Sequence, residues 1–385
     1  MKTIFIDGLG LVDGHFSGVG QYIHGILKGI DELIDQELYA GKEAPKVVVI
    51  VPYDSVPRFK HFGFKHLAYK KLPFSFRVMS SLWHRGKLPP IDLWCGRGVY
   101  VFPRFVSMPL AFSKSAVVIF DLSFEHHRQY SDEGNAKFLS RAVKKSVKKT
   151  KKVITISNNA RSEILDFYKL SPKKVVVATP ATDPRIFYRR SQREIDSIKY
   201  KYGIKKDYIL ALSNLEPRKN LDSLVEVYCS LPKKYSKDTS LLLVGVSGWK
   251  TDQLFKKIIN KVQQGYDIIR PTSYVLDADK AAIISGAKML VYPSHYEGFG
   301  MPPLEALACG TPVICSNNSS LPEVVGETAI LLNSKDRNAL KRAIINELDD
   351  STVKKAIANG PSQARHFSWK ASAQVFLDVA KEISK

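Results

Sequence analysis

The chain has 385 residues, of which 44% are hydrophobic and 25% are charged. Such a chain is too long for one ordinary core and suits two domains of about 150–200 residues each. No apolar run approaches the roughly 20 residues that span a bilayer, so the sequence excludes a transmembrane helix of ordinary length.

The charge is unusual and unevenly distributed. The formal net charge is +21, and residues 1–190 hold 31 Lys and Arg against 16 Asp and Glu. A strongly basic N-terminal half indicates an anionic partner. The candidates are nucleic acid, a phospholipid surface and a phosphorylated substrate. The four cysteines form no CxxC pair and have no histidine at zinc spacing. We therefore expect a reducing, cytoplasmic location without a disulfide framework.

Short, continuously apolar runs recur along the chain, separated by stretches with helical periodicity. Such runs are typical of strands buried on both faces, and hence of parallel sheets with crossover helices. Two consecutive sets predict two doubly wound domains. The first run, in MKTIFIDGLG, reads as a buried strand and not as a signal peptide. The predicted strands are Thr3–Ile6, Val47–Val51, Ala116–Phe120, Val153–Ile156, Val175–Ala178, Tyr208–Leu212, Leu241–Val244, Met289–Tyr292 and Pro312–Cys315.

The segment from Ser55 to Ile91 contains no Asp or Glu. Its basic residues alternate with aromatic ones, which suits a membrane interface, where rings lie at headgroup depth and cations meet anionic lipid. The same pattern suits single-stranded nucleic acid. We expect an anionic membrane and no nucleic acid, with contacts from Lys65, Lys70, Lys71 and Trp83.

A polar, mostly charged stretch at residues 184–206 separates the two sets of predicted strands. Beyond it, ILALSNLEPRKNLDSLVEVY (209–228) predicts a strand, a loop and an amphipathic helix. Arg218 and Lys219 lie just before this helix, where two cations can neutralise a leaving pyrophosphate. The alternative interpretation is an exposed basic turn.

The segment AKMLVYPSHYEGFGMPPLEALACGTPVICS (287–316) places a glycine-containing loop between a predicted strand and a helix. Pro302 and Pro303 suit a first helical turn, and Gly310 suits the position just after the helix. A loop of this kind leading into a helix N-terminus is a site for a diphosphate. Two carboxylates, Glu297 and Glu305, can face one pocket and hydrogen-bond two sets of sugar hydroxyls. The alternative is that Glu297 is a solvated loop residue and Glu305 an acidic residue stabilised by the helix N-terminus, which is the more frequent case when two glutamates of this spacing occur without a surrounding motif.

The string EGFG-P-LEALACGTPV closely resembles the family-4 retaining glycosyltransferases, which have the GT-B fold and whose hallmark is Glu, seven residues, Glu. The resemblance covers most of the chain. It implies an α/β protein of GT-B type, with two doubly wound parallel-sheet (Rossmann-like) domains facing a cleft. FSW at residues 367–369 matches the family's final segment, where the chain crosses back onto the first domain. The predicted domains are therefore 1–185 with a C-terminal helix at 368–385 for the acceptor, and 186–367 for the nucleotide sugar.

The resemblance also implies roles for single residues. Glu297 would hold the hydroxyls of the transferred sugar and Glu305 the ribose hydroxyls. The glycine loop GHFSGVGQYIHGIL would bring backbone near the donor phosphate or the acceptor hydroxyl. Arg218 would replace an arginine that many relatives have at Ser213, directly after the strand. The predicted donor-binding residues are Glu305, Ser213, Gly298, Phe299, Gly300, Met301, Gly18 and Gly20.

One position departs from the family pattern. Where many relatives read His-Asp at the end of a strand, this chain has Phe120 and Asp121. Phe120 cannot accept a proton, so we expect the leaving phosphate to act as the base and Asp121 to hold the loop or contact the acceptor. His126 and His127 are the local alternatives.

The sequence thus predicts a retaining hexosyltransferase, peripheral at the inner face of the cell membrane, that acts on a lipid-linked or polysaccharide acceptor. Mannose from GDP-mannose is the favoured donor, with UDP-hexoses and dTDP-rhamnose as alternatives. We expect no cofactor and no metal. Two other functions stay open on the same scaffold: a non-catalytic nucleic-acid or anion-binding protein, and a nucleotide-sugar epimerase.

Overall fold

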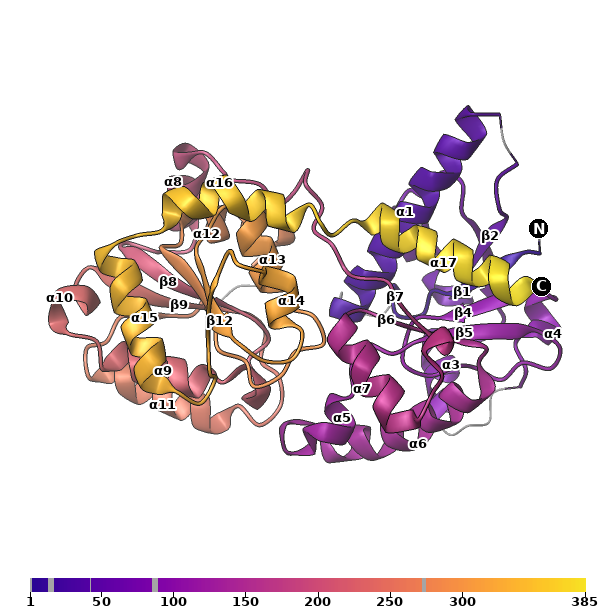
Figure 1. Cartoon of the computed structure of the whole chain (residues 1–385), viewed down its shortest axis with the longest axis horizontal. Coiled ribbons are helices and arrows are strands. Elements are labelled where there is room, and N and C mark those ends of the chain that lie inside the picture. Colours follow the sequence, from indigo (N-terminus) through magenta and orange to yellow (C-terminus); the bar gives the residue numbers. More distant parts are fainter. Residues whose placement is uncertain (1, 13–16, 42, 85–88, 272–274) are drawn as a thin grey trace. The chain divides into compact units, whose positions relative to one another are not determined.

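The structure of the chain is a computed structural model, and it describes residues 2–12, 17–41, 43–84, 89–271 and 275–385 (Figure 1). The chain divides into two compact units, Met1–Pro180 with Ser368–Lys385, and Ala181–Phe367. The sequence placed this division at residues 185 and 186, and it assigned residues 368–385 to the first unit. Both units are α/β, each with one parallel sheet.

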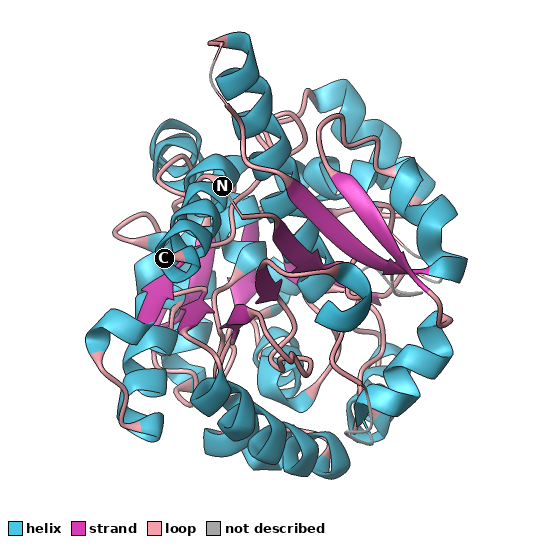
Figure 2. Ribbon diagram, turned by 90° about the vertical axis from the view of Figure 1, so that its right-hand side faces the viewer, coloured by secondary structure: helices cyan, strands magenta, loops and turns pink. Residues whose placement is uncertain are grey.

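The first unit contains a seven-stranded parallel sheet in the order β3-β2-β1-β4-β5-β6-β7. Its strands lie between layers of helices (Figure 2). Each predicted strand of this half overlaps an observed one, but β3 and β4 were not predicted. β3 is an edge strand whose first four residues are exposed, so it has no apolar run. The strands are β1 Ile4–Asp7, β2 Val47–Pro52, β3 Ala68–Leu72, β4 Val99–Phe102, β5 Lys114–Val118, β6 Lys152–Thr155 and β7 Val175–Val177.

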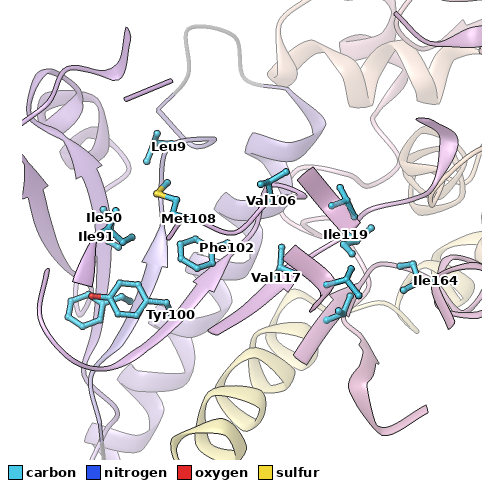
Figure 3. Packing of buried hydrophobic residues seen from close by; sticks show 14 of the residues in the cluster. Leu9, Ile50, Ile91, Tyr100, Phe102, Val106, Met108, Val117, Ile119 and Ile164 are labelled. Atoms are coloured by element: carbon cyan, nitrogen blue, oxygen red, sulfur yellow. The ribbon is translucent and has the colours of Figure 1, made fainter. Parts of the chain in front are cut away.

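The core of this unit follows from the alternation of side chains along buried strands. Tyr100 and Phe102 of β4 point to the same face, where they stack with ring centroids 6.2 Å apart (Figure 3). Phe5 of β1 stacks on Tyr100 at 4.7 Å. Val99 and Val101 are buried on the opposite face, so β4 is covered on both sides, as parallel strands usually are. The helices of the unit are α1 Gly18–Tyr39, α2 Val56–His61, α3 Phe76–His84, α4 Asp92–Cys95, α5 Ser123–His126, α6 Glu133–Lys149, α7 Asn158–Tyr168 and α17 Trp369–Ser384.

The second unit contains a six-stranded parallel sheet in the order β10-β9-β8-β11-β12-β13. The short strands β10 and β13 were not predicted, because two or three residues carry too little periodicity. The strands are β8 Asp207–Leu212, β9 Thr239–Val244, β10 Ile268–Ile269, β11 Met289–Tyr292, β12 Val313–Ser316 and β13 Ile330–Leu332. The helices are α8 Gln192–Lys201, α9 Leu221–Cys229, α10 Lys233–Ser236, α11 Asp252–Gln263, α12 Asp277–Gly286, α13 Met301–Ala308, α14 Leu321–Val325, α15 Arg337–Asp349 and α16 Val353–Ala364.

The last helix packs along the first one within the first unit (Figure 1). The contact is close because Gly25 and Gly29 of α1 have no side chain. A Cβ at Gly25 would lie 2.4 Å from the indole ring of Trp369, and one at Gly29 would lie 2.6 Å from the Trp369 carbonyl oxygen. The Ser372 hydroxyl of α17 also donates to the carbonyl of Thr179 at 2.6 Å. The C-terminal helix is therefore an integral part of the first unit.

A side chain at Gly25 tests this packing. Gly25→Val forces the indole ring or the helix to shift, so we expect the free energy of unfolding of the first unit to fall by about 1–3 kcal/mol. Denaturant unfolding followed by circular dichroism measures the change. Gly18→Val is the matched control at the start of the same helix, where no heavy atom lies within 4 Å of the added Cβ. Equal losses in both variants would contradict a tight contact at Gly25.

Candidate active site

Two loops meet at the carboxyl ends of the adjacent strands β8 and β11 of the second unit. The first loop follows β8 and ends in a 3-10 turn, Pro217–Lys219. The second follows β11 and leads to α13 through Gly300. The carbonyl of Arg218 accepts from the backbone N–H of His295 at 2.8 Å, which ties the two loops together. The carboxyl ends of parallel strands are where doubly wound folds bind ligands.

The Lys219 ammonium is buried in this place and bonded to the second loop. Its Nζ donates to Glu297 Oε1 at 2.7 Å and to the hydroxyl of Tyr292 at 2.9 Å. Lys219 is 8% exposed and Glu297 is 5% exposed. A buried charge needs such a partner, because an unpaired one is strongly destabilising. The predicted alternative of an exposed basic turn is therefore wrong for Lys219.

The Arg218 guanidinium lies between two carboxylates. It donates through Nη1 to Glu297 Oε2 at 3.3 Å and through Nη2 to Glu216 Oε1 at 2.8 Å. It also donates to the carbonyl of Tyr296 at 3.0 Å. Glu216 is 4% exposed, and sequence reasoning missed it. A carboxylate two residues before a predicted anion-binding arginine was the available signal.

The ionisation of Glu297 follows from these contacts. Burial by itself raises the pKa of this carboxyl, but the charges of Lys219 and Arg218 outweigh burial and lower the pKa to about 2. Burial, and then the Glu297 charge, raise the pKa of the Tyr292 hydroxyl well above its usual range. Glu297 is therefore a carboxylate, and Tyr292 a neutral hydrogen-bond partner, at neutral pH.

Hydrogen bonds from a third loop fix the backbone around Glu297. The Ser319 hydroxyl accepts from the Glu297 N–H at 2.9 Å, with Ser319 in the left-handed region (φ 49°). The Ser320 hydroxyl donates to the carbonyls of Glu297 at 2.9 Å and Phe299 at 2.6 Å. Asn220 donates through its amide to the carbonyl of Pro293 at 3.1 Å. No local sequence pattern indicated these positioning residues.

Helix α13 begins at Met301, as the two prolines predicted. Gly300 has φ 119°, and a Cβ there would lie 2.7 Å from Leu321. Pro302 and Pro303 have no N–H, so the first turn presents the Met301 N–H next to the loop amides. Glu305, in the second turn, is 6% exposed. Gly310 has φ 66° just after the helix, as expected.

Other predicted donor-binding residues in the second unit take part in packing or in backbone hydrogen bonds. The Phe299 ring is buried and packs edge-on against Phe367, with centroids 5.3 Å apart. Gly298 is buried in the same loop. Ser213 directly follows β8, and its N–H donates to the carbonyl of Val244 at 3.0 Å.

In the first unit, Asp121 holds the loop that follows β5. Its Oδ1 accepts from the Ser123 N–H at 2.9 Å, which is one of the two roles expected for it. Phe120 is a core residue, with its ring 5.2 Å from that of Tyr22. His126 is exposed and packs edge-on against Phe167 at 5.4 Å, and His127 stacks near Tyr130 at 6.2 Å. Phe120 therefore takes part in the packing of the first unit's core.

The predicted glycine loop caps a helix. The Ser17 hydroxyl accepts from the Gly20 N–H at 3.3 Å, and Gly18 is the exposed first residue of α1. The residues 13–16 of this loop lie outside the described residues.

Among the predicted membrane-contact residues, Lys65, Lys70 and Lys71 are exposed. The last two lie in the edge strand β3. Trp83 is in α3, and its side chain lies outside the described part of the structure.

Two negative findings concern the described residues alone. None of their helices is both long and apolar enough to cross a membrane. Within the same ranges, no group of three or more His, Cys, Asp or Glu side chains is arranged to hold a metal ion.

Comparisons with known proteins agree with this architecture. Residues 192–363 match the family described as glycosyl transferases group 1. The chain is 33% identical over 274 residues to the O-antigen chain mannosyltransferase B of Escherichia coli, covering 71% of each protein. It is 28% identical over 232 residues to the serotype-specific mannosyltransferase WbdA of Escherichia coli, covering 59% of this chain but 28% of that longer protein.

The fold also has close structural neighbours. The crystal structure of Anabaena Alr3699/HepE in complex with UDP-glucose aligns with a TM-score of 0.71 at 14% sequence identity. The alignment covers 99% of this chain and 100% of that one. This likeness concerns the fold alone, and it agrees with the predicted GT-B type with two Rossmann-like units.

The depressed pKa of Glu297 predicts a pH-dependent contribution to stability. Its folded-state pKa of about 2 lies below the ordinary value of 4.5. The contribution is therefore fully present above about pH 4.5 and is lost as the pH falls toward 2, and its size is about 3 kcal/mol. We expect Glu297→Gln to be less stable than the wild type by about this amount near neutral pH, with the difference shrinking from about pH 5 to about pH 3.

Denaturant unfolding at a series of pH values measures this difference. Glu327→Gln, which removes an exposed loop carboxylate of the same unit, is the control and should change stability little at any pH. A Glu297→Gln deficit that stays constant down to about pH 3 would contradict the ion-pair account.

Proposed function

The chain belongs to the group 1 glycosyl transferases, and from this premise we propose that it transfers mannose from GDP-mannose, with retention and without a metal ion. The proposed acceptor is a lipid-linked or polysaccharide glycan of the cell surface. The second unit binds the nucleotide sugar and the first unit binds the acceptor, at the inner face of the cell membrane.

The observation that carries this proposal is the buried cluster of Glu216, Arg218, Lys219 and Glu297 at the carboxyl ends of β8 and β11. Two cations and a helix N-terminus meet there, as a diphosphate requires. Mannose is favoured because the O-antigen chain mannosyltransferase B and WbdA are both mannosyltransferases by name. GDP is proposed as the nucleotide because the sequence favours GDP-mannose as the mannose donor.

The charges of the cluster constrain how it binds a diphosphate. Arg218 and Lys219 carry two positive charges, and Glu216 and Glu297 carry two negative ones, so the four side chains are formally neutral. In our proposal an incoming diphosphate draws the two cations partly away from their carboxylates, while Met301 N–H and the loop amides bind the remaining oxygens. The cations then stabilise the charge that develops on the leaving group.

With its ion pairs intact Glu297 is a carboxylate, and in our proposal it acts as a hydrogen-bond acceptor and not as a general acid. As a carboxylate it accepts hydrogen bonds from hydroxyls of the transferred sugar and stabilises positive charge on an oxocarbenium-like transition state. Glu305, buried in the second turn of α13, accepts from the ribose hydroxyls. In this proposal Glu297 therefore determines mainly the rate of transfer, and Glu305 mainly the affinity for the nucleotide.

The proton of the acceptor hydroxyl goes to the leaving phosphate. The bond from C1 of the sugar to the diphosphate oxygen breaks, the bond from C1 to the acceptor oxygen forms on the same face, and that phosphate oxygen takes the proton. Phe120 packs in the core and cannot accept a proton, and Asp121 is engaged with the Ser123 N–H. A side-chain base is not needed for this route.

A donor screen tests the proposed function. We expect slow hydrolysis of GDP-mannose in the absence of acceptor, exceeding that of UDP-hexoses and dTDP-rhamnose. Glu297→Gln should lower the turnover number by about 10²-fold without weakening GDP binding, because it removes a transition-state interaction and also removes one carboxylate that competes with the diphosphate for Arg218 and Lys219. Glu305→Gln should weaken GDP binding by about 10-fold, since it removes charge-assisted hydrogen bonds.

Hydrolysis is followed by release of GDP, and affinity by calorimetric titration, with Glu327→Gln as the control. Wild-type rates in both site variants would refute the site assignment. Epimerised donor without hydrolysis or transfer would favour the epimerase alternative, and binding of single-stranded oligonucleotides without GDP binding would favour the non-catalytic one.

Transfer should also survive removal of divalent metal. Arg218, Lys219 and the α13 N-terminus supply the positive charge that a metal ion supplies in other transferases. We therefore expect EDTA to change the initial rate by less than about twofold. A tenfold loss of rate would correspond to about 1.4 kcal/mol of lost transition-state stabilisation. Complete loss of activity in EDTA, restored by manganese, would contradict this charge accounting.

A further inference from the structure

The amino ends of the first unit's strands carry a row of basic residues. Each of the seven strands has a Lys or Arg at its first residue or among the three residues before it, and none of these three-residue segments contains Asp or Glu. Because all seven strands are parallel, these residues come to one edge of the sheet. We take one exposed residue for each strand and call these seven the amino-edge row; in sheet order from β3 to β7 they are Lys65, Lys46, Lys2, Arg97, Lys114, Lys151 and Lys173.

The row extends across the whole width of the first unit's sheet. Neighbouring strands lie about 4.8 Å apart, so seven strands place the row along about 29 Å. All seven members are exposed. The charge of Lys151 is close enough to Lys174 to contribute, after burial, to lowering the Lys174 pKa. Like charges are thus close together at this end of the sheet.

Few of these cations have a carboxylate partner. The ion pairs of the described residues include Lys152 with Glu382 at this edge, but they do not include Lys46, Arg97, Lys114, Lys151 or Lys173. Lys2 donates to the carbonyl of Ser384 at 2.7 Å. The row therefore retains most of its positive charge.

The second unit shows that the fold does not require this arrangement. At the amino edge of its sheet, acidic residues neutralise the lysines: Lys206 pairs with Asp267 at 3.0 Å, and Lys288 pairs with Asp207 at 2.8 Å. Favourable interaction with helix C-termini does not explain the whole row. Lys151 follows the end of α6 by two residues, but no helix ends directly before Lys114 in the described chain, and only the single-turn α4 precedes Arg97.

An exposed apolar cluster lies at the middle of the row. Phe112 precedes β5 and is 65% exposed, with the Arg97 guanidinium 5.0 Å from its ring centroid. Leu93 and Trp94 of α4 are 59% and 38% exposed. Figure 1 places α4 and both chain ends at the same end of the first unit. We call Leu93, Trp94 and Phe112 the apolar cluster.

The apolar cluster is held in place by a buried carboxylate. Asp92 is 4% exposed and accepts from the backbone N–H groups of Ala111, Phe112 and Ser113 at 2.8, 2.8 and 2.9 Å. These three bonds join α4 to the loop before β5. The buried Asp92 thus holds α4 and the loop before β5 in a position that leaves the apolar cluster exposed. Exposed groups of large apolar side chains usually mark an interaction surface.

We propose that the amino-edge row and the apolar cluster form a docking surface for an anionic phospholipid membrane, with Phe112, Leu93 and Trp94 entering the interface. This inference rests on the membrane location in the proposed function and assigns it to specific residues. Aromatic side chains at the centre of a row of cations match the headgroup region of an anionic bilayer. The surface lies at the opposite edge of the first sheet from Asp121, so docking leaves the carboxyl edge of that sheet accessible.

Charge reversal at the centre of the row tests the electrostatic part. Arg97→Glu with Lys114→Glu should weaken sedimentation with vesicles of equal parts phosphatidylglycerol and phosphatidylcholine by about 30-fold or more. Lys205→Glu with Lys237→Glu is the matched control, because these exposed lysines lie at the amino edge of the second sheet. It should bind as the wild type does.

The apolar part is tested by Leu93→Ser with Phe112→Ser, which should weaken the same binding by about 10-fold. Tyr200→Ser with Ile259→Ser, which removes two exposed apolar residues of the second unit, is the control. Vesicles with brominated acyl chains should quench tryptophan fluorescence, and Trp94→Phe should remove the quenching, whereas Trp83→Phe should not.

Any of three results would overturn the proposal: unchanged binding in the Arg97 and Lys114 variant, equal losses in the second-unit controls, or equal binding to pure phosphatidylcholine. Loss of binding in a Lys70→Glu, Lys71→Glu variant, with wild-type binding in the Arg97 and Lys114 variant, would place docking on β3 and would also overturn it. Preference for an oligonucleotide or an acidic protein over vesicles would do the same. Thermal denaturation and GDP affinity, expected to be unchanged, show that the variants are folded. The donor screen fails or succeeds independently of vesicle binding, so the proposed function is judged separately.

Discussion

The buried ion pair between Lys219 and Glu297 is the interaction on which the candidate site depends. Neither charge is stable in this interior without the other, so the pair fixes the loop after β8 against the loop after β11. Arg218 extends the pair to Glu216, and Ser319 and Ser320 fix the backbone on either side of Glu297. The cluster is therefore preorganised by its own ion pairs and hydrogen bonds, and a diphosphate would have to compete with two carboxylates for its cations.

Parallel sheets separate two kinds of surface in this protein. Loops after the strands carry the ion cluster in the second unit and Asp121 in the first. Segments before the strands carry the amino-edge row in the first unit and neutralised lysines in the second. Part of the excess of positive charge in residues 1–190 thus lies along one edge of a sheet, where the strand spacing sets the spacing of the charges.

The C-terminal helix completes the first unit in a way that depends on small residues. Gly25 and Gly29 let α17 approach α1 closely, and Trp369 fills the resulting contact. The hydroxyl of Tyr22, also on α1, donates to the carbonyl of Ala178 at 2.9 Å. Together with Ser372, it fixes the segment at which the chain leaves the first unit.

The sequence by itself determined the doubly wound architecture, the two segments that carry Arg218, Lys219 and Glu297, and the start of α13, whereas the ion pairs between these side chains came from the structure. These features depend on local periodicity, on proline and glycine chemistry, and on one long motif. The tertiary structure decided the rest. Ser319 and Ser320 became recognisable only when the loops after β11 and β12 came together. The amino-edge row is spread over residues 2–173, and only the strand order brings its members to one edge. Sequence patterns report neighbours along the chain, whereas these charges act on neighbours in space.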